Sequence, residues 1–311
     1  MKALILDLTH KVLLDCLSEA GIELCLHPEY EREDLLKEIH NYEALVVRSK
    51  LQIDKTIIDA GTRLRCIART GAGMDTIDVQ YAQSKSIQCL NSPEGNRTAV
   101  GEHALGMLLC LFNKIALGNK EVKEWQWNRE KNRGLEVEGK TIGIIGYGNM
   151  GGSFAKHLCG FDCTVLAYDK YKKDYSDSYA CEASLEEIFA KADILSLHVP
   201  LTEETRSMVN YEFLSRFAKH LYLINTSRGK VVATHDLVRA MKEGKVAGCC
   251  LDVLEQEKFS SELEDAKNED LSYLFSVPNT VLTPHVAGWS VESYYKLAYF
   301  LGKKIVDCLC K

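Results

Sequence analysis

Residues 141–151, Thr-Ile-Gly-Ile-Ile-Gly-Tyr-Gly-Asn-Met-Gly, carry the pattern that decides the fold. An apolar, strand-like run ends in G-x-G-x-x-G, and a helical pattern follows over residues 153–158. In such a turn Gly146 makes the tight bend, Gly148 lets the backbone approach a pyrophosphate, and Gly151 permits close packing of helix against strand. The following helix N-terminus adds amide donors and a positive dipole. This stretch therefore predicts a dinucleotide-binding unit.

A carboxylate stands at the end of the next predicted strand, residues 164–168. Asp169 comes 23 positions after Gly146, close to the ~20 expected of the acid that binds the ribose hydroxyls. A carboxylate there also repels a 2′-phosphate, which favours NAD over NADP, although the adjacent Lys170 weakens this preference. We therefore expect NAD as the cofactor.

Strand-like and helical patterns alternate on both sides of this motif, which is typical of parallel strands joined by crossover helices. At 311 residues and ~150 residues per domain, the chain should form about two domains. A long apolar helix is predicted from about Thr98 to Asn119, and the acidic stretch Phe259–Val277 is predicted to be a surface excursion. Strands are predicted at 3–7, 22–26, 44–48, 65–69, 87–90, 141–145, 164–168, 194–198, 221–225, 248–251 and 280–282, and further helices at 11–19, 32–40, 55–60, 79–84 and 291–310.

The composition narrows the classes of function. Hydrophobic residues make up 46% and charged residues 26%, the ordinary balance of a globular protein. A net charge of −6 provides no general polyanion-binding surface, and no apolar run approaches the ~20 residues of a membrane span. The twelve cysteines form no C-x-x-C motif and lie mostly in apolar runs. We therefore expect no nucleic-acid, membrane or metal binding, and free thiols in a reducing cytoplasm.

Three predicted strands in the second half of the chain run into chemically useful side chains, Arg228, Glu257 and His285. Ligands of open α/β sheets bind beyond the carboxyl ends of the strands, so these residues should converge. Glu257 could orient His285 and stabilise its protonated form, and Arg228 could hold a substrate carboxylate with two hydrogen bonds. By position alone, each could equally be a surface charge or a helix cap.

The order of these motifs resembles that of the D-isomer-specific 2-hydroxyacid dehydrogenases. The resemblance rests on GxGxxG with Asp169, HVPLTEET, INTSRGKVV, AGCCLDVLEQE and TPHVAG, and in the first half on VRSK, ARTGAGMDTIDV and NSPEGNRTAVGEHALGMLL. It covers nearly the whole chain. It implies an α/β protein in which a Rossmann NAD-binding domain, residues 99–287, is inserted into a flavodoxin-like substrate-binding domain, residues 1–98 plus 288–311.

The resemblance also implies roles for particular residues. His285 would be the acid–base group, Glu257 its partner, and Arg228 the anchor of the substrate carboxylate and carbonyl. A homodimer would form through the helix around 98–119. Cofactor contacts are expected at Gly146, Gly148, Asn149, Met150, Gly151, Asp169, Pro200, Thr205, Thr226, Ser227, Asp252 and Gly288. Substrate contacts are expected at Arg48, Ser49, Lys50, Arg69, Gly71, Ala72 and Gly73.

The identity of the hydroxyacid depends on the cations of the substrate domain. Arg48, Lys50 and Arg69, with Lys131 and Arg133 reaching from a partner subunit, would offset the charge of a phosphorylated acid. This pattern is similar to the branch of the family that oxidises 3-phospho-D-glycerate to 3-phosphohydroxypyruvate, in serine biosynthesis. If these cations are only solvated surface charges, a smaller acid such as glycerate, glyoxylate or lactate is expected.

Two further alternatives and several departures bear on this expectation. A non-catalytic NAD-sensing scaffold would keep many of the same motifs, whereas Glu257 argues against a formate dehydrogenase, which carries Gln there. Lys258 stands where Pro is common, and Trp289 stands where small hydroxyl residues are common and could shape the substrate pocket. The chain ends soon after its closing helix, so no C-terminal regulatory domain is expected.

Overall fold

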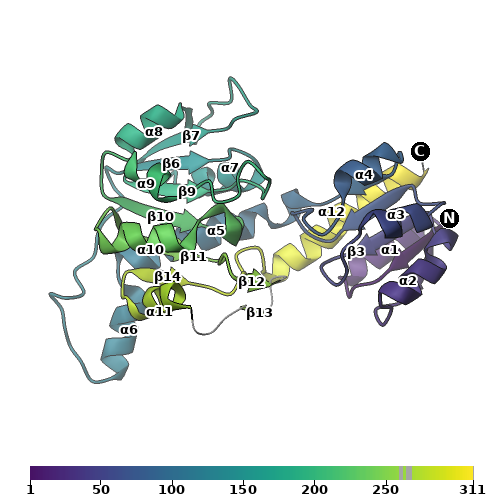
Figure 1. Cartoon of the computed structure of the whole chain (residues 1–311), viewed down its shortest axis with the longest axis horizontal. Coiled ribbons are helices and arrows are strands. Elements are labelled where there is room, and N and C mark those ends of the chain that lie inside the picture. Colours follow the sequence, from purple (N-terminus) through teal and green to yellow (C-terminus); the bar gives the residue numbers. More distant parts are fainter. Residues whose placement is uncertain (259–261, 264–267, 311) are drawn as a thin grey trace. The chain divides into compact units, whose positions relative to one another are not determined.

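The computed structural model describes residues 1–258, 262–263 and 268–310. The chain divides into two compact units, Met1–Arg97 with Trp289–Lys311, and Thr98–Gly288. Figure 1 labels the elements of both units. Within the acidic stretch expected as a surface excursion, residues 259–261 and 264–267 lie outside the described residues.

The first unit is built on a five-stranded sheet of order β2-β1-β3-β4-β5, in which every neighbouring pair is parallel. This is the flavodoxin-like order expected from the sequence. The strands are β1 (Lys2–Ile5), β2 (Glu23–Leu26), β3 (Ala44–Val47), β4 (Cys66–Arg69) and β5 (Gln88–Leu90). The helices are α1 (Lys11–Glu19), α2 (Arg32–Glu38), the 3-10 turn η1 (Ile39–Asn41), α3 (Lys55–Ala60), α4 (Val79–Ser84) and α12 (Val291–Cys310).

Alternation along the strands divides the core of this unit between the two faces of the sheet. Ala3 and Ile5 of β1 pack in one cluster with residues of α1 and α12, whereas Leu4 packs in a second cluster with residues of α2, α3 and α4. The apolar positions Ala298, Leu301, Ile305 and Leu309 recur at helical spacing along α12. Burial of this stripe makes the C-terminal helix part of the N-terminal unit.

The second unit contains a seven-stranded sheet of order β14-β11-β10-β9-β6-β7-β8, again with every pair parallel. Numbered from β6, the order is 3-2-1-4-5-6-7, which extends the doubly wound dinucleotide-binding topology by one strand. The strands are β6 (Thr141–Ile145), β7 (Thr164–Tyr168), β8 (Cys181–Glu182), β9 (Ile194–Leu197), β10 (Leu221–Asn225), β11 (Val246–Leu251) and β14 (Thr280–Leu282). A separate short hairpin pairs β12 (Glu257–Lys258) with β13 (Glu262–Leu263).

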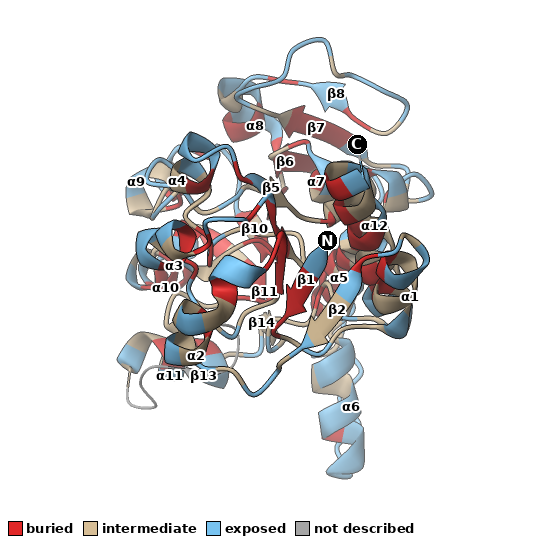
Figure 2. Ribbon diagram, turned by 90° about the vertical axis from the view of Figure 1, so that its right-hand side faces the viewer, coloured by how far each residue is buried: buried red, intermediate tan, exposed pale blue. Residues whose placement is uncertain are grey.

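Helices cover both faces of the larger sheet. They are α5 (Pro93–Phe112), α6 (Ile115–Lys123), α7 (Asn149–His157), α8 (Leu185–Lys191), α9 (Tyr211–Ser215), η2 (Gly229–Val231), α10 (Thr234–Lys242) and α11 (Glu269–Ser276). One core cluster joins α5 and α7 to one face, and a second joins α8, α9, α10 and α11 to the other. Figure 2 shows the buried strands in red and the outer helix surfaces in pale blue. The fold class expected from the sequence is therefore confirmed.

The single helix expected at Thr98–Asn119 is wrong. The structure has α5 and α6 instead, bent by 57° at a break where Lys114 adopts a left-handed backbone with φ of 52°. The carbonyl of Phe112 accepts a hydrogen bond of 2.9 Å from the amide of Leu135, which returns from outside the helix. In the described chain no single helix is long and apolar enough to cross a membrane, and α5 and α6 reach that length and hydropathy only as the bent pair.

The acidic stretch Phe259–Val277 is not wholly a surface excursion. Its last part forms α11, which Asn268 caps by accepting hydrogen bonds from the amides of Asp270 and Leu271. Leu271 and Leu274, three residues apart, are buried in the core of the second unit. The acidic residues at the helix start favour the helix dipole, which is why an acidic composition here accompanies a packed helix.

Candidate functional site

The glycine loop between β6 and α7 is built around close backbone approaches. Gly146 has φ of 94°, and a Cβ there would lie 2.5 Å from the carbonyl oxygen of His198. A Cβ at Gly151 would lie 2.1 Å from the carbonyl oxygen of Gly146. In contrast, no described protein atom lies within 4 Å of a Cβ built at Gly148. The first and third glycines are therefore required by the protein itself, and the second faces open space.

The start of α7 fits the pyrophosphate of a dinucleotide. Gly148 is the N-cap residue, and no side chain caps the helix. The amides of the first turn, which begins with Asn149 and Met150, are therefore directed toward the open space beside Gly148. This cradle matches the expected cofactor contacts in the glycine motif.

Asp169 lies directly after β7, and both of its carboxylate oxygens accept hydrogen bonds from backbone amides. The amide of Tyr147 in the glycine loop donates to Oδ2 at 3.0 Å, and the amide of Tyr171 donates to Oδ1 at 3.0 Å. The carboxylate is thereby fixed beside the glycine loop. Each oxygen keeps a further lone pair for a ribose hydroxyl, so the geometry fits the adenosine end of NAD.

The other expected cofactor residues of this unit differ in their surroundings. The Thr205 hydroxyl donates to the Pro200 carbonyl at 2.6 Å within its own loop. Asn225 holds Ser227 by accepting from its amide and its hydroxyl, at 3.0 and 2.7 Å. The Thr226 hydroxyl is buried without a hydrogen-bond partner in the described chain. A buried hydroxyl at a strand end that lacks a protein partner is suited to a ligand.

His198 follows β9 at the edge that carries the glycine loop. Its Nε2 lies 2.8 Å from the hydroxyl of Ser196, and its Nδ1 is shielded from solvent. Burial lowers the pKa of His198 to about 3, because the enclosed imidazole loses the hydration that would stabilise its charge. His198 is therefore neutral at physiological pH.

His285 and Glu257 are brought together as the sequence predicted. The carboxylate of Glu257, on the short strand β12, contacts Nδ1 of His285 in a close hydrogen bond and ion pair. Both side chains are largely shielded, with exposed fractions of 28% for His285 and 17% for Glu257. A carboxylate at Nδ1 fixes the orientation of the ring and leaves Nε2 for a reacting group.

The turn that carries His285 is held by the buried carboxylate of Asp252, which is 1% exposed. Its oxygens accept from the hydroxyl of Thr283 at 2.6 Å and from the amides of Val286 and Ala287 at 2.9 and 2.8 Å. His285 has a left-handed backbone with φ of 54°, a conformation uncommon outside glycine. These bonds offset the backbone strain, so the described contacts of Asp252 serve the histidine turn.

His103 joins this network and was not singled out in the sequence. From α5, its Nε2 lies 3.0 Å from the Thr283 hydroxyl and 3.6 Å from the carboxylate of Asp252. The only signal was its place in the GEHALG segment of the stretch NSPEGNRTAVGEHALGMLL. It is connected to the turn of His285 through Thr283 and Asp252.

Arg228 lies at the end of β10, where the chain comes close to the segment after β11. A Cβ at the next residue, Gly229, would lie 1.9 Å from the carbonyl oxygen of Leu254. The Arg228 guanidinium donates to the carbonyl of Ser227 at 2.7 Å, and the Arg228 carbonyl accepts from the Asn225 side chain at 3.0 Å. Arg228 thus shares the strand-end edge with Glu257 and His285. Gly288 closes this unit.

In the first unit, Arg48 and Arg69 are organised by the backbone around the carboxyl ends of β3 and β4. Arg69 donates to the carbonyls of Arg48 and Gly73 at 2.8 and 2.7 Å. The Arg48 guanidinium stacks on the ring of Trp289 at 4.3 Å. The carbonyls of Gly71 and Ala72 accept from the Ser92 amide and the Asn91 side chain.

Three other cations expected near the substrate have carboxylate partners. Lys50 donates to the Pro28 carbonyl at 2.6 Å and lies 3.2 Å from the carboxylate of Glu31. Lys131 pairs with Glu121 at 2.8 Å and Arg133 with Glu130 at 2.7 Å. Ser49, which is also expected to contact the substrate, lies next to Lys50 in the segment after β3. Among the side chains that the structure describes, no group of three or more His, Cys, Asp or Glu residues is placed to hold a metal ion.

Comparison with known proteins defines the class. Residues 105–287 match the model of the family described as D-isomer specific 2-hydroxyacid dehydrogenase, NAD binding domain. The chain belongs to this family, whose members are NAD-dependent oxidoreductases. The family, the class of enzyme and NAD as its cofactor are therefore confirmed.

Particular relatives differ in their substrates. The chain is 36% identical to a hydroxypyruvate reductase of Thermotoga maritima, over 88% of this chain and 87% of that protein. It is 32% identical to a D-3-phosphoglycerate dehydrogenase of Archaeoglobus fulgidus over 99% of this chain, which spans 57% of the length of that relative. A crystal structure of D-lactate dehydrogenase from Aquifex aeolicus, complexed with NAD and lactic acid, is 28% identical with a TM-score of 0.82, over 98% of this chain and 94% of that one.

Proposed function

We propose that this protein interconverts a D-2-hydroxyacid and its 2-oxoacid, with His285 as the acid–base residue. The contact between Glu257 and Nδ1 of His285 carries this proposal, because it prepares one histidine for reversible proton transfer at Nε2. NAD, when bound, would accept the hydride in oxidation and return it in reduction.

Each side chain of the strand-end edge has a defined task in this reaction. Neutral His285 takes the hydroxyl proton during oxidation, and the carboxylate of Glu257 stabilises the imidazolium that results. In reduction the protonated ring gives the proton back to the forming alkoxide. The planar guanidinium of Arg228 binds the substrate carboxylate in both directions, because its paired N–H donors match two carboxylate oxygens.

We propose that the physiological reaction is the NAD-dependent oxidation of 3-phospho-D-glycerate to 3-phosphohydroxypyruvate, a step of serine biosynthesis. The stack of Arg48 on Trp289 supports a phosphorylated substrate. Stacking occupies a face of the guanidinium, and its in-plane N–H groups remain directed outward to bind an anion. The relatives named D-3-phosphoglycerate dehydrogenase match this chain over 96–99% of its length.

A smaller hydroxyacid is the second candidate, and the pairing of Lys50 with Glu31 favours it. A lysine already bound to a carboxylate contributes less to the binding of a phosphate. Glycerate with hydroxypyruvate, glyoxylate or lactate would then be the substrate pair, as in the relatives named hydroxypyruvate reductase and glyoxylate reductase.

A panel of acids separates these functions. NADH formation by the purified chain would be measured with 3-phospho-D-glycerate, D-glycerate and D-lactate, and NADH consumption with hydroxypyruvate and glyoxylate. The largest kcat/KM for the phosphorylated acid would support the first proposal, and saturable activity only with the unphosphorylated acids would refute it. No activity with any of these acids, in a protein that still binds NAD, would indicate the non-catalytic scaffold.

We also propose a homodimer, with α6 and the segment after it as the contact. The apolar side chains Ile115, Val122, Trp125 and Trp127 are 52–97% exposed here, and α6 is pale blue over most of its surface in Figure 2. Apolar groups exposed together favour a protein contact. Light scattering should give twice the mass of the chain, and Trp125→Glu with Trp127→Glu should shift it to the monomer; an unchanged mass would place the contact elsewhere.

The cytoplasm is the proposed location. Each of the twelve cysteines lies in the described part of the chain and has a free thiol. Burial raises the pKa of the Cys249 thiol to about 12, which suits an unreactive core side chain. Free thiols throughout a chain fit a reducing compartment, and fractionation of the native cell would test the assignment.

A further inference from the structure

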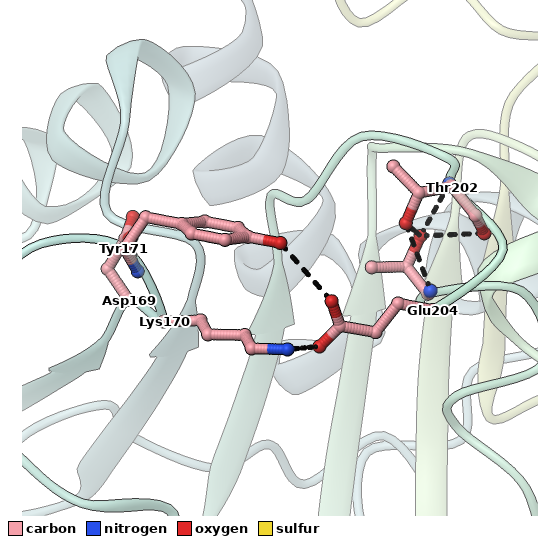
Figure 3. A network of polar contacts seen from close by, with 6 residues as sticks. Asp169, Lys170, Tyr171, Thr202 and Glu204 are labelled. Carbon is pink, nitrogen blue, oxygen red and sulfur yellow. Dashed lines mark hydrogen bonds and ion pairs between the residues drawn. The ribbon is translucent and has the colours of Figure 1, made fainter.

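A polar bridge joins the loop after β7 to the loop after β9 (Figure 3). The ammonium of Lys170 forms an ion pair and hydrogen bond with Oε1 of Glu204. The hydroxyl of Tyr171 donates to the other carboxylate oxygen at 3.2 Å. Lys170 and Tyr171 thus reach the same carboxylate from consecutive positions.

The bridge links the loops on either side of the glycine loop. In the sheet, β7 and β9 flank β6 on its two sides, so a link between their following loops crosses the carboxyl end of β6, where the glycine loop begins. Lys170 also comes directly after Asp169, the carboxylate fitted to the ribose hydroxyls. A cation beside this position would accommodate a 2′-phosphate.

Glu204 is presented by a turn with its own hydrogen bonds. The amide of Thr202 donates to the Thr205 hydroxyl at 2.8 Å, and the amide of Thr205 donates to the Thr202 hydroxyl at 3.2 Å. The Thr205 hydroxyl in turn donates to the Pro200 carbonyl at 2.6 Å. The backbone of Glu204 is therefore held between two reciprocal contacts, and its side chain extends toward Lys170 (Figure 3).

The charges of this bridge decide what the adenosine end can bind. With the bridge formed, Glu204 neutralises Lys170, so the adjacent ammonium no longer compensates the charge of Asp169. The neighbouring Lys172 donates to the Tyr147 carbonyl at 2.6 Å and so binds the glycine loop. The hydrogen bond to Lys170 lowers the pKa of Glu204, so its carboxylate remains charged at neutral pH.

We propose that Glu204 is a specificity-determining residue for the cofactor: it holds the Lys170 ammonium away from the ribose 2′ position, so that the site favours the unphosphorylated dinucleotide. Asp169 repels a 2′-phosphate, and Glu204 withdraws the adjacent cation that would compensate this repulsion. The proposal rests on the dinucleotide site and is independent of which hydroxyacid is the substrate.

Equilibrium binding tests this role without turnover. The dissociation constants of NADP⁺ and NAD⁺ would be measured by titration calorimetry on the full chain and on Glu204→Gln. Freeing Lys170 should lower the ratio of the NADP⁺ dissociation constant to the NAD⁺ dissociation constant by about 3- to 10-fold. This is the size of change expected when a half-exposed ion pair is broken and one repelling charge is lost. An unchanged ratio would refute the proposal.

Two further variants make the test specific. Glu203→Gln is the matched control, because Glu203 is adjacent, 96% exposed and 3.8 Å from Arg206, and it removes the same charge without releasing Lys170. Glu204→Gln combined with Lys170→Ala should restore the original ratio. An equal change in the Glu203 variant would overturn the proposal in favour of net charge alone. A gain retained in the double variant would overturn it by showing that Lys170 is not the group that compensates the 2′-phosphate.

Thermal unfolding of each variant would confirm that the fold is intact. Lys170 and Glu204 are about half exposed, so their replacement should change the free energy of unfolding little. The quantity compared is the ratio of the NADP⁺ and NAD⁺ dissociation constants, both measured on the same protein sample. A reduced fraction of active protein therefore affects both constants equally. A failure of the proposed enzyme activity would leave this binding result unaffected.

Discussion

Replacing Gly148 with alanine should separate cofactor binding from folding. A methyl group at this position meets no described protein atom within 4 Å, and the backbone φ of −98° is open to alanine. The stability of the fold should change little, because the lower conformational freedom of alanine in the unfolded state is offset by its poor fit as an N-cap residue with ψ of −149°. The same methyl group occupies the space in which the backbone approaches the pyrophosphate.

The expected loss of affinity follows from one hydrogen bond. A hydrogen bond to a charged group contributes about 1.5–3 kcal/mol. If the methyl group prevents one amide–phosphate contact, the dissociation constant of NAD⁺ should rise by about 10- to 150-fold, since 1.4 kcal/mol corresponds to a factor of ten. Calorimetric titration with NAD⁺ and urea unfolding of the same preparation measure the two effects independently.

Two neighbouring glycines provide matched controls for this experiment. A Cβ at Gly152 also meets no described atom within 4 Å, and alanine inside α7 should stabilise the fold by about 0.5–1 kcal/mol with no change in NAD⁺ binding. A Cβ at Gly151 would lie 2.1 Å from the Gly146 carbonyl, so Gly151→Ala should cost about 1–3 kcal/mol of stability and weaken binding. Wild-type NAD⁺ affinity in Gly148→Ala would refute the reasoning.

Further predictions concern the catalytic edge and the pH dependence of stability. His285→Ala should lower turnover by ~10²–10⁴-fold while NAD⁺ affinity, measured by titration, hardly changes; retained turnover would remove His285 from the mechanism. Arg228→Lys should raise the KM for the hydroxyacid by about tenfold or more, because an ammonium cannot form the paired hydrogen bonds of a guanidinium; an unchanged KM would place the carboxylate elsewhere. Because the pKa of His198 is about 3 in the fold against 6.5 in the unfolded chain, the unfolded state binds more protons below pH 6.5. Stability should therefore fall by about 3 kcal/mol from pH 6.5 to pH 4, and urea unfolding of His198→Gln should show a smaller fall; an equal fall would contradict this role.

The strands of the second unit could be read from the sequence because their signals are local. The predicted ranges 141–145, 164–168, 221–225 and 280–282 coincide with β6, β7, β10 and β14. Each is a short apolar run bounded by polar or glycine residues, and a strand buried on both faces requires such a run. The glycine loop was equally clear, since its three glycines have separate local tasks.

The errors arose where distant residues compete for backbone or apolar groups. The break between α5 and α6 depends on Leu135, which takes the carbonyl of Phe112, and no pattern within residues 98–119 shows this. The helix α11 was missed because acidic residues conceal the buried pair Leu271 and Leu274. Both outcomes were decided by tertiary packing rather than by local propensity.

The candidate site divides in the same way. The sequence predicted that His285, Glu257 and Arg228 belong to one site, because strand ends of a parallel sheet share one edge. It did not reveal that Asp252 and His103 support the histidine turn, since those contacts join residues up to 180 positions apart.

The G-x-G-x-x-G stretch and the order of motifs by themselves determined the family, the doubly wound topology and the choice of a nicotinamide cofactor. These properties depend on residue types at fixed spacing along the chain, and that spacing can be read from the sequence without a structure. Only the tertiary structure decided which charges are already paired, including Lys50 with Glu31 and Lys170 with Glu204. Charge pairing depends on distance in space, and a distance of a few ångströms between loops that are tens of residues apart is fixed only when the chain folds.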